Sequence, residues 1–284
     1  MTIFIIQLLN SFFYAAVLFL IAAGLSLIYG VMRIVNLAHG SYFMLGGYVG
    51  LSVAWRTGSY VLALLVGALV VALVGIVMER AFLRRLPGQT LGQVLMTIGF
   101  ALIFQDVALL IWGGDPYTIR VPPQLSGVVT AGPGRFPIYR IFIVAVAVVV
   151  GAVLWLALDR TRVGAMIRAA VDDAEMAQGV GIRVPRVSLG VFALGAALAA
   201  FGGVVGAGFL GVYPGLDFEI LPYAFVVVIV GGLGSLPGAM VGSLMVGLLD
   251  NFGKALFPEL SYFTLFAPMA LILALKPTGL FGRV

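Results

Sequence analysis

Long apolar stretches with almost no charged residues dominate this chain and limit what it can fold into. The first charged side chain is Arg33, so the first 32 residues carry none. A helix needs about 20 apolar residues to cross roughly 30 Å of hydrocarbon. We find eight runs of about that length, at residues 3–28, 34–55, 60–78, 90–112, 138–158, 187–212, 220–250 and 260–275. The chain is therefore expected to cross a membrane repeatedly.

The amino-acid composition also indicates a membrane protein. Hydrophobic residues make up 62% and charged residues 10% of the 284 residues, with a mean hydropathy of +1.18, whereas soluble domains carry roughly 25% charged residues. The runs lack the two-residue alternation of a membrane β-barrel, so helices are expected. We predict an all-α polytopic transmembrane helical bundle with eight or nine crossings, formed as one domain by residues 1–284. The first run has no cleavage-site pattern and is interpreted as a retained span.

The basic residues indicate an orientation. Sixteen lysines and arginines give a net charge of +5, but they form no continuous basic face, which argues against nucleic-acid binding. They are densest in the loops 80–89 and 159–186, which we assign to the cytoplasm because basic loops favour that side. If run 220–250 crosses twice, eleven basic residues lie inside and five outside. The N-terminus is then outside and the C-terminus inside the cytoplasmic membrane of a prokaryote. If that run crosses once, the C-terminus moves outside.

Two of the runs are interrupted by residues that break helices. Asn36, His39 and Gly40 interrupt the second run, and a glycine-rich stretch with Gly232 and Ser235 interrupts the seventh. Freed backbone groups are tolerated in a membrane only inside protein or beside a watery cavity, and paired broken helices often mark a transport site. We predict a substrate pathway from both breaks and the fourth run, with Asn36, His39, Gly40, Ser41, Tyr42, Gln93, Thr97, Gly232 and Ser235 as its residues.

His39 is the only histidine of the chain, and it lies in an apolar run. A buried imidazole costs free energy unless it is hydrogen-bonded, and ionisable side chains within spans tend to face a pathway. Two roles stay open: a residue that lines or gates the pathway, and a hydrogen bond between two helices. With no acidic residue near it in sequence, we expect a neutral imidazole that holds the backbone around Gly40.

The loop 159–186 has the pattern of a short amphipathic helix. Small apolar residues alternate with Asp172, Asp173 and Glu175, and Gly179 follows as a helix stop. We predict a cytoplasmic helix over 164–178. A solvated connector is the alternative, but apolar residues on an exposed helix favour a docked partner.

Over nearly its whole length the chain resembles the branched-chain amino acid ABC-transporter permease family. The resemblance rests on three ordered motifs: GLSLIYGVMRIVNLAHGSYFMLGGY at 24–48, RAAVDDAEMAQGVGI at 168–182 and VVVIVGGLGSLPGAMVGSLMVG at 226–247. It implies a permease subunit that pairs with a second related permease, two cytoplasmic ATPases and an extracytoplasmic solute-binding protein. It also implies an ATPase contact at Arg168, Ala169, Asp172, Asp173, Glu175, Ala177, Gly179 and Ile182.

The sequence itself also indicates that this chain does not hydrolyse ATP. The single Gly-Lys pair, in NFGKALF, lacks the GxxxxGK[ST] pattern of a phosphate-binding loop. ATP and Mg²⁺ are therefore expected on partner subunits, and no cofactor on this chain. A metal site or hydrolase is not predicted, since cysteine, HExxH and GxSxG are all absent from the sequence. A stand-alone secondary carrier or channel is the alternative from another class, although only Asp106, Arg140 and Asp250 approach the spans.

The solute stays open at this stage. The family that the chain resembles transports branched-chain and other amino acids, and also urea and short amides. An uncharged pathway favours a zwitterionic amino acid or a small neutral amide. The loops 113–137 and 211–220 are the largest expected outer surfaces for a solute-binding protein.

Overall fold

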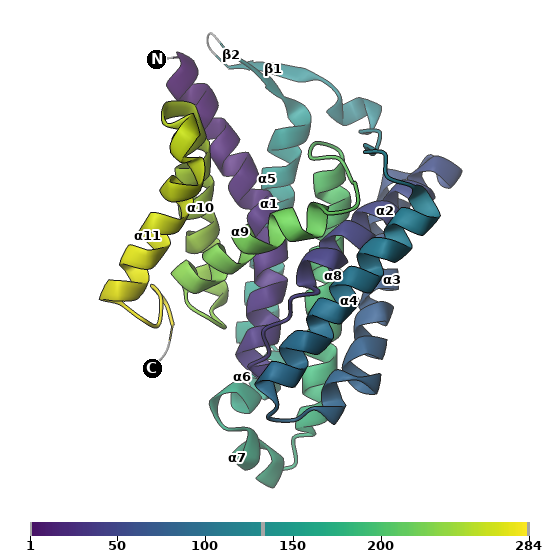
Figure 1. The fold of residues 1–284 in the computed structure, drawn as a ribbon, viewed down its shortest axis with the longest axis vertical. Helices are drawn as coiled ribbons and strands as arrows, with labels where there is room; N and C mark the ends of the chain where they lie inside the picture. Colours follow the sequence, from purple (N-terminus) through teal and green to yellow (C-terminus); the bar gives the residue numbers. More distant parts are fainter. Residues whose placement is uncertain (1, 132–133, 283–284) are drawn as a thin grey trace.

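The computed structural model describes residues 2–131 and 134–282. It is a bundle of helices with one short β-hairpin (Figure 1). The helices are α1 (Thr2–Met32), α2 (His39–Thr57), α3 (Tyr60–Ala81), α4 (Thr90–Trp112), α5 (Ile138–Arg160), α6 (Arg162–Asp172), α7 (Ala174–Gly179), α8 (Val184–Ala207), α9 (Leu216–Gly231), α10 (Leu236–Leu256) and α11 (Ser261–Leu275). Short 3-10 helices are η1 (Leu83–Arg85), η2 (Pro123–Leu125) and η3 (Pro258–Leu260). The hairpin pairs β1 (Val128–Ala131) with β2 (Gly134–Pro137) in antiparallel register.

Seven of the eight predicted apolar runs lie largely on one helix each, and run 220–250 lies on the two helices α9 and α10, which confirms the all-α transmembrane bundle. Five helices of the described residues, α1, α3, α4, α5 and α8, are long and apolar enough to cross a membrane individually. The bent pair of α9 and α10 adds a sixth span if it is counted as one. The eight or nine crossings stay a prediction.

The break predicted in the seventh run is present. α9 ends at Gly231, α10 begins at Leu236, and the two helices are bent by 120°. Gly232 and Gly234 have φ angles of 106° and 80°, which glycine adopts without a Cβ clash. The other break is placed differently from the prediction, because residues 33–38 lie outside any helix and precede α2 instead of interrupting it.

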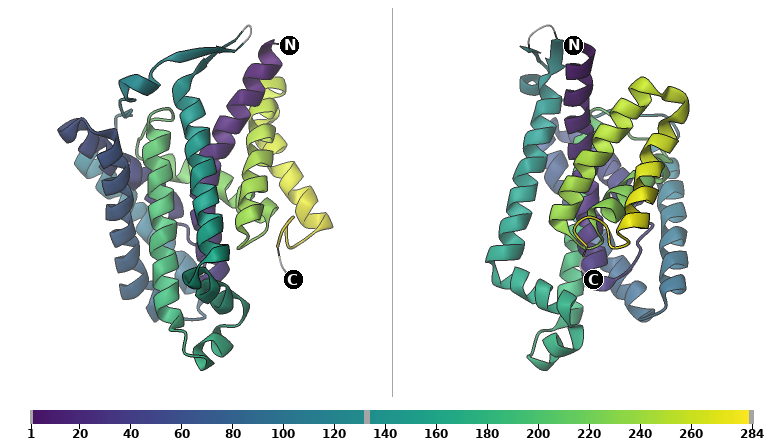
Figure 2. Two further views of the ribbon diagram at one scale, coloured as in Figure 1. Left: turned by 180° about the vertical axis from the view of Figure 1, so that it is seen from behind. Right: turned by 90° about the vertical axis from the view of Figure 1, so that its left-hand side faces the viewer.

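Helix α1 lies at the centre of the bundle. Of its most apolar 18-residue window 78% is buried, against 17% for the corresponding windows of α4 and α5. α8 and α10 pack directly on α1, and α2 and α3 pack on α8 (Figure 2). Glycines allow this approach, since a Cβ at Gly24 would overlap the carbonyl of Gly195, and one at Gly203 would overlap that of Phe43. The exposed apolar faces of α4 and α5 are suited to lipid.

The two ends of the bundle differ. The hairpin lies at one end, and α6 and α7 lie at the other (Figure 1). At the hairpin end, Tyr117 and Val212 exchange backbone hydrogen bonds of 2.9 and 2.7 Å, which joins the two predicted outer loops. The Arg140 guanidinium lies 4.4 Å from the ring centroid of Phe209 and 5.2 Å from that of Phe13. These cation–π contacts hold the start of α5 against α1.

The single helix predicted over 164–178 is wrong, because the structure has two helices there. Asp173 is extended, with φ −153° and ψ 103°, and its Oδ1 accepts a hydrogen bond of 2.9 Å from the Met176 backbone NH. A short carboxylate side chain favours this N-cap position over a helix interior. The predicted stop at Gly179 is confirmed, since α7 ends there.

Candidate translocation and coupling sites

Side chains hold part of the backbone of residues 33–38, which lie between α1 and α2. Arg33 has φ 55°, the only positive value at a non-glycine residue in the described part of the chain. Asn36 Oδ1 accepts a hydrogen bond of 3.1 Å from the Ala38 NH. On α4, Thr97 Oγ1 accepts one of 3.2 Å from the Leu37 NH. Two side chains therefore accept hydrogen bonds from the Leu37 and Ala38 NH groups in place of helical carbonyls.

His39 is the first residue of α2 and has no exposed surface. Its Nε2 lies 2.9 Å from the carbonyl oxygen of Ile21 on α1. Because a carbonyl only accepts, Nε2 donates, and the bond joins two helices. The neighbouring Tyr42 is also fully buried, and its hydroxyl donates to Met78 Sδ on α3 at 2.8 Å. In this structure both side chains pack inside the chain, and contact with a solute stays a prediction.

Substitution of His39 tests this packing role. We expect His39→Gln to keep most of the free energy of unfolding, since an amide NH can still donate to the Ile21 carbonyl. His39→Leu removes the donor and should cost about 1–2 kcal/mol. SDS titration of the purified protein in mixed micelles measures the difference. A neutral imidazole also predicts uptake without a single-proton transition from about pH 6 to 8. Such a transition in the wild type that is absent from His39→Gln would contradict it.

The buried carboxylate of Asp217 was missed in the sequence. Ser41 Oγ donates to Asp217 Oδ2 at 2.7 Å, and both side chains are buried. Gly40 is required here, because a Cβ would overlap the Asp217 carbonyl oxygen. Asp217 lies in the first turn of α9 and contacts the first turn of α2 through Ser41, so two helix N-termini favour a negative charge that burial disfavours. We expected loop 211–220 to be an outer surface; at Asp217, which is 2% exposed, that is wrong.

Three of the predicted pathway residues lie apart from segment 36–42. Gln93 Nε2 donates to the Leu86 carbonyl at 2.8 Å, in the turn before α4. Gly232 and Ser235 lie in the α9–α10 break, where Ser235 Oγ accepts a hydrogen bond of 3.1 Å from the Gly238 NH and caps α10. Among the described residues, no hydrogen bond joins them to segment 36–42. Thr97 thus contacts the first break, at residues 33–38. The second break, between α9 and α10, lies apart from it.

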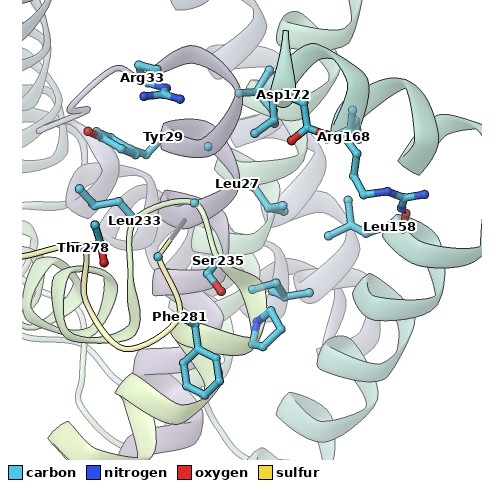
Figure 3. Close-up of a pocket in the computed structure, with 18 of the residues that line it drawn as sticks. Leu27, Tyr29, Arg33, Leu158, Arg168, Asp172, Leu233, Ser235, Thr278 and Phe281 are labelled. Carbon is cyan, nitrogen blue, oxygen red and sulfur yellow. The ribbon is translucent and has the colours of Figure 1, made fainter. Parts of the chain in front are cut away.

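A pocket of about 670 Å³ lies beside the α9–α10 break (Figure 3). Its wall consists of the ends of α1 and α5, part of α6, the start of α10 and the C-terminal turn. Ser235 lines it from the break, and Arg33, Arg168 and Asp172 line it from the other side. The pocket therefore places the second break next to the loop predicted to contact an ATPase.

The predicted ATPase-contact residues divide into buried and exposed ones. Ala177 is 3% exposed, and its carbonyl accepts a hydrogen bond of 3.0 Å from the Ile182 NH. Arg168 donates to the Leu158 carbonyl and lies 3.7 Å from Asp159. The exposed members are Arg168, Asp172, Asp173, Glu175 and Gly179, while Ala169 and Ile182 are half-buried. Ala177 thus stabilises α7 itself, and a bulky charged residue there would disturb the helix before any docking.

Three larger apolar side chains are exposed on this loop instead. Val163, Met176 and Val180, which we call the apolar trio, are 59%, 66% and 72% exposed. Met176 is among the apolar residues that predict a helix in this loop, whereas Val163 and Val180 were not predicted. Exposed apolar residues at the charged end of a bundle are typical of an interaction site.

Comparison with known proteins adds the family. The family described as "Branched-chain amino acid transport system / permease component" matches residues 7–275. The chain is 30% identical over 296 residues to the high-affinity branched-chain amino acid transport system permease protein BraD of Pseudomonas aeruginosa, covering 98% of this chain and 95% of that protein. It is 32% identical over 302 residues to the corresponding protein LivH of Escherichia coli, covering 99% and 96%. The ribose import permease protein RbsC of Haemophilus influenzae is 32% identical over 132 residues, 44% of this chain and 41% of that protein. The chain belongs to the family of branched-chain amino acid transport system permease components.

Proposed function

We propose that this chain is the membrane-spanning subunit of an ATP-driven importer, and that its solute is a branched-chain or other zwitterionic amino acid. The observation that carries the proposal is the apolar trio, which projects from the α6–α7 end of a bundle whose helices are suited to lipid. A secondary carrier needs no such docking loop. The family and the printed names of its near full-length relatives support the same reading.

The proposal includes four kinds of partner subunit. We propose a second, related permease, two cytoplasmic ATPases that bind ATP and Mg²⁺, and an extracytoplasmic solute-binding protein. The chain itself lacks a phosphate-binding loop, so hydrolysis is assigned to the ATPases. The outer loop 113–137, which Tyr117 joins to the backbone of Val212, is the proposed docking surface for the solute-binding protein.

Co-purification tests the partners. When this chain is expressed from its native chromosomal locus with an affinity tag, we expect it to bring two ATPase polypeptides and a second permease with it. ATP hydrolysis by the purified material should be stimulated by the solute-binding protein. A chain that purifies alone and transports its solute on an ion gradient would support a secondary carrier instead.

The orientation follows from the charged end of the bundle. We propose that the α6–α7 end faces the cytoplasm of a prokaryotic cell, because the arginine-rich loops 80–89 and 159–186 both lie there. The N-terminal end of α1 lies at the hairpin end, hence outside. Phe281 lines the pocket together with Arg168, which supports a C-terminus inside. This path corresponds to nine crossings, with α9 and α10 crossing separately.

The choice of solute needs its own test, since the family that the chain resembles also includes permeases for urea and short amides. We expect unlabelled leucine, isoleucine and valine to compete with labelled leucine for ATP-driven uptake. Urea and acetamide at the same concentration should leave uptake unchanged. Competition by urea but not by isoleucine would assign the chain to the amide branch, and competition by ribose would point to the relationship with RbsC.

We propose further that segment 36–42, with Thr97, supports and gates the pathway. Single cysteines at Asn36, His39 and Ser41 test this in a chain that has no cysteine of its own. All three side chains are fully buried, so a water-soluble thiol reagent should react slowly in one nucleotide state. In the other state we expect at least about tenfold faster reaction. Thr57→Cys, at the exposed end of α2, is the control. Equal protection in both states would leave these residues a packing role only.

A further inference from the structure

An ion pair at the α6–α7 end belongs to neither candidate site. Glu79 on α3 is 2% exposed, and Arg84 on η1 contacts it twice, with Nε to Oε1 at 3.2 Å and Nη2 to Oε2 at 3.0 Å. Paired bonds of a guanidinium with a carboxylate fix the geometry of both groups. Because a buried carboxylate without a partner is strongly unfavourable, Glu79 determines where Arg84 lies.

The chain between Glu79 and Arg84 turns at the end of α3, so that the Arg84 side chain lies against α3. Phe82 leaves the helical range, with φ −123° and ψ −63°, and ends α3. Leu83 is 1% exposed and anchors the following turn in the bundle. The next residue, Arg84, therefore points back along the helix that has just ended.

The same guanidinium also reaches the first turn of α8. Its Nη2 donates to the Pro185 carbonyl at 3.0 Å, across 101 residues of sequence. Only residues 180–183 separate the end of α7 from the start of α8, and this connection is a compact turn. Gly181 turns the chain at φ 90°, and the Val184 NH donates to the Ile182 carbonyl at 3.0 Å. Arg84 thus holds the chain where it leaves loop 159–186, which we call the coupling loop.

The entrance to this loop is held less firmly than the exit. At the entrance, Arg168 donates to the Leu158 carbonyl and lies 3.7 Å from Asp159, and the two charged side chains are 43% and 48% exposed. Exposed pairs of this kind contribute little to stability. The exit differs because its arginine forms a two-bond ion pair with a buried carboxylate and also contacts the backbone of α8.

We infer that Arg84, oriented by Glu79, is a positioning residue that transmits movement of α7 to α3 and α8 together. The inference rests on the proposed function, in which α7 contacts an ATPase. α3 and α8 pack closely along their length; a Cβ at Gly75 would lie 2.9 Å from the Ala196 Cβ. Without the Pro185 contact, residues 180–184 can absorb the movement, and ATP is hydrolysed without transport.

Arg84→Lys tests the inference because it keeps a cation beside Glu79 but lacks the planar fork that contacts Glu79 and Pro185 together. The complete transporter is reconstituted in proteoliposomes, and leucine uptake and phosphate release are measured together. We expect ATP hydrolysis within about twofold of the wild type and a loss of about fivefold in leucine molecules transported per ATP. Arg85→Lys, at the adjacent exposed arginine, is the matched control and should keep the wild-type ratio.

Glu79→Gln is the second variant, and it keeps the test decisive if Arg84→Lys lowers the yield of complex. The amide in Glu79→Gln keeps one oxygen that can accept a hydrogen bond from Arg84. The number of leucine molecules transported per ATP should therefore lie between the values of the wild type and Arg84→Lys. A wild-type ratio in both variants overturns the inference. Uptake and hydrolysis that fall in proportion also overturn it, because a purely structural role predicts that result. Absence of ATP-driven uptake in the wild type contradicts the proposed function instead.

Discussion

Replacing Met176 and Val180 with aspartate is expected to separate this permease from its ATPase partners. Both side chains are mostly exposed, at 66% and 72%, so the substitutions leave the bundle intact. In an interface they would bury a carboxylate without a partner, and central contacts of this kind are worth about 2 kcal/mol or more each. Each substitution should therefore weaken ATPase binding about 30-fold, and the double variant should lose ATP-driven uptake.

Titration of the tagged permease with purified ATPase measures this effect. Gln178→Asp is the matched control, since it places the same carboxylate on an exposed polar position of α7 and should bind nearly as well as the wild type. Ala177→Asp should fail differently, by unfolding α7, because Ala177 is buried. If Met176→Asp and Val180→Asp bind the ATPase as tightly as Gln178→Asp, the apolar trio is not the docking surface.

Ser41→Ala is expected to be the most destabilising single-atom deletion among the predicted pathway residues. It removes the donor to Asp217 Oδ2, a bond of 2.7 Å between side chains that are both buried. Hydrogen bonds to charged groups contribute about 1.5–3 kcal/mol, and a buried carboxylate left unsatisfied costs at least as much. We expect a loss of about 2–3 kcal/mol in the free energy of unfolding.

A double-mutant cycle separates this bond from general packing. The second variant is Asp217→Asn, which removes the charge and keeps the volume, and the third combines both changes. SDS titration in mixed micelles gives the three free energies. The two substitutions should interact by about 1 kcal/mol or more, since removal of the charge makes the missing donor less costly. Strictly additive effects would show that Ser41 and Asp217 do not depend on each other.

Much of the fold is visible in the sequence because lipid leaves few choices for the backbone. Every peptide group in hydrocarbon needs an internal partner, so long uncharged runs predict helices. The break between α9 and α10 is visible for a related reason. Glycine at Gly232 and Gly234 permits backbone angles that other residues avoid, and the sequence concentrates glycine there.

The features that were mispredicted depend on contacts that the sequence does not reveal. Asp217 is paired with a serine 176 residues away, and no local pattern shows that its loop enters the bundle. The split of the coupling loop did have a local signal, because Asp173 is a favourable N-cap residue. Alternation of alanines and acids continued across it and suggested one helix. Ser235 caps α10 beside a pocket apart from segment 36–42, and a pathway shared by the two breaks stays a prediction.

The central claim is that this chain provides the membrane passage while partner subunits supply the energy. The most direct measurement is leucine uptake into proteoliposomes that contain the full complex, with and without ATP, after an ionophore has collapsed all ion gradients. We predict uptake that requires ATP and the ATPase subunits and that persists without any gradient. Uptake by this chain alone, driven by an ion gradient and indifferent to ATP, would contradict the account.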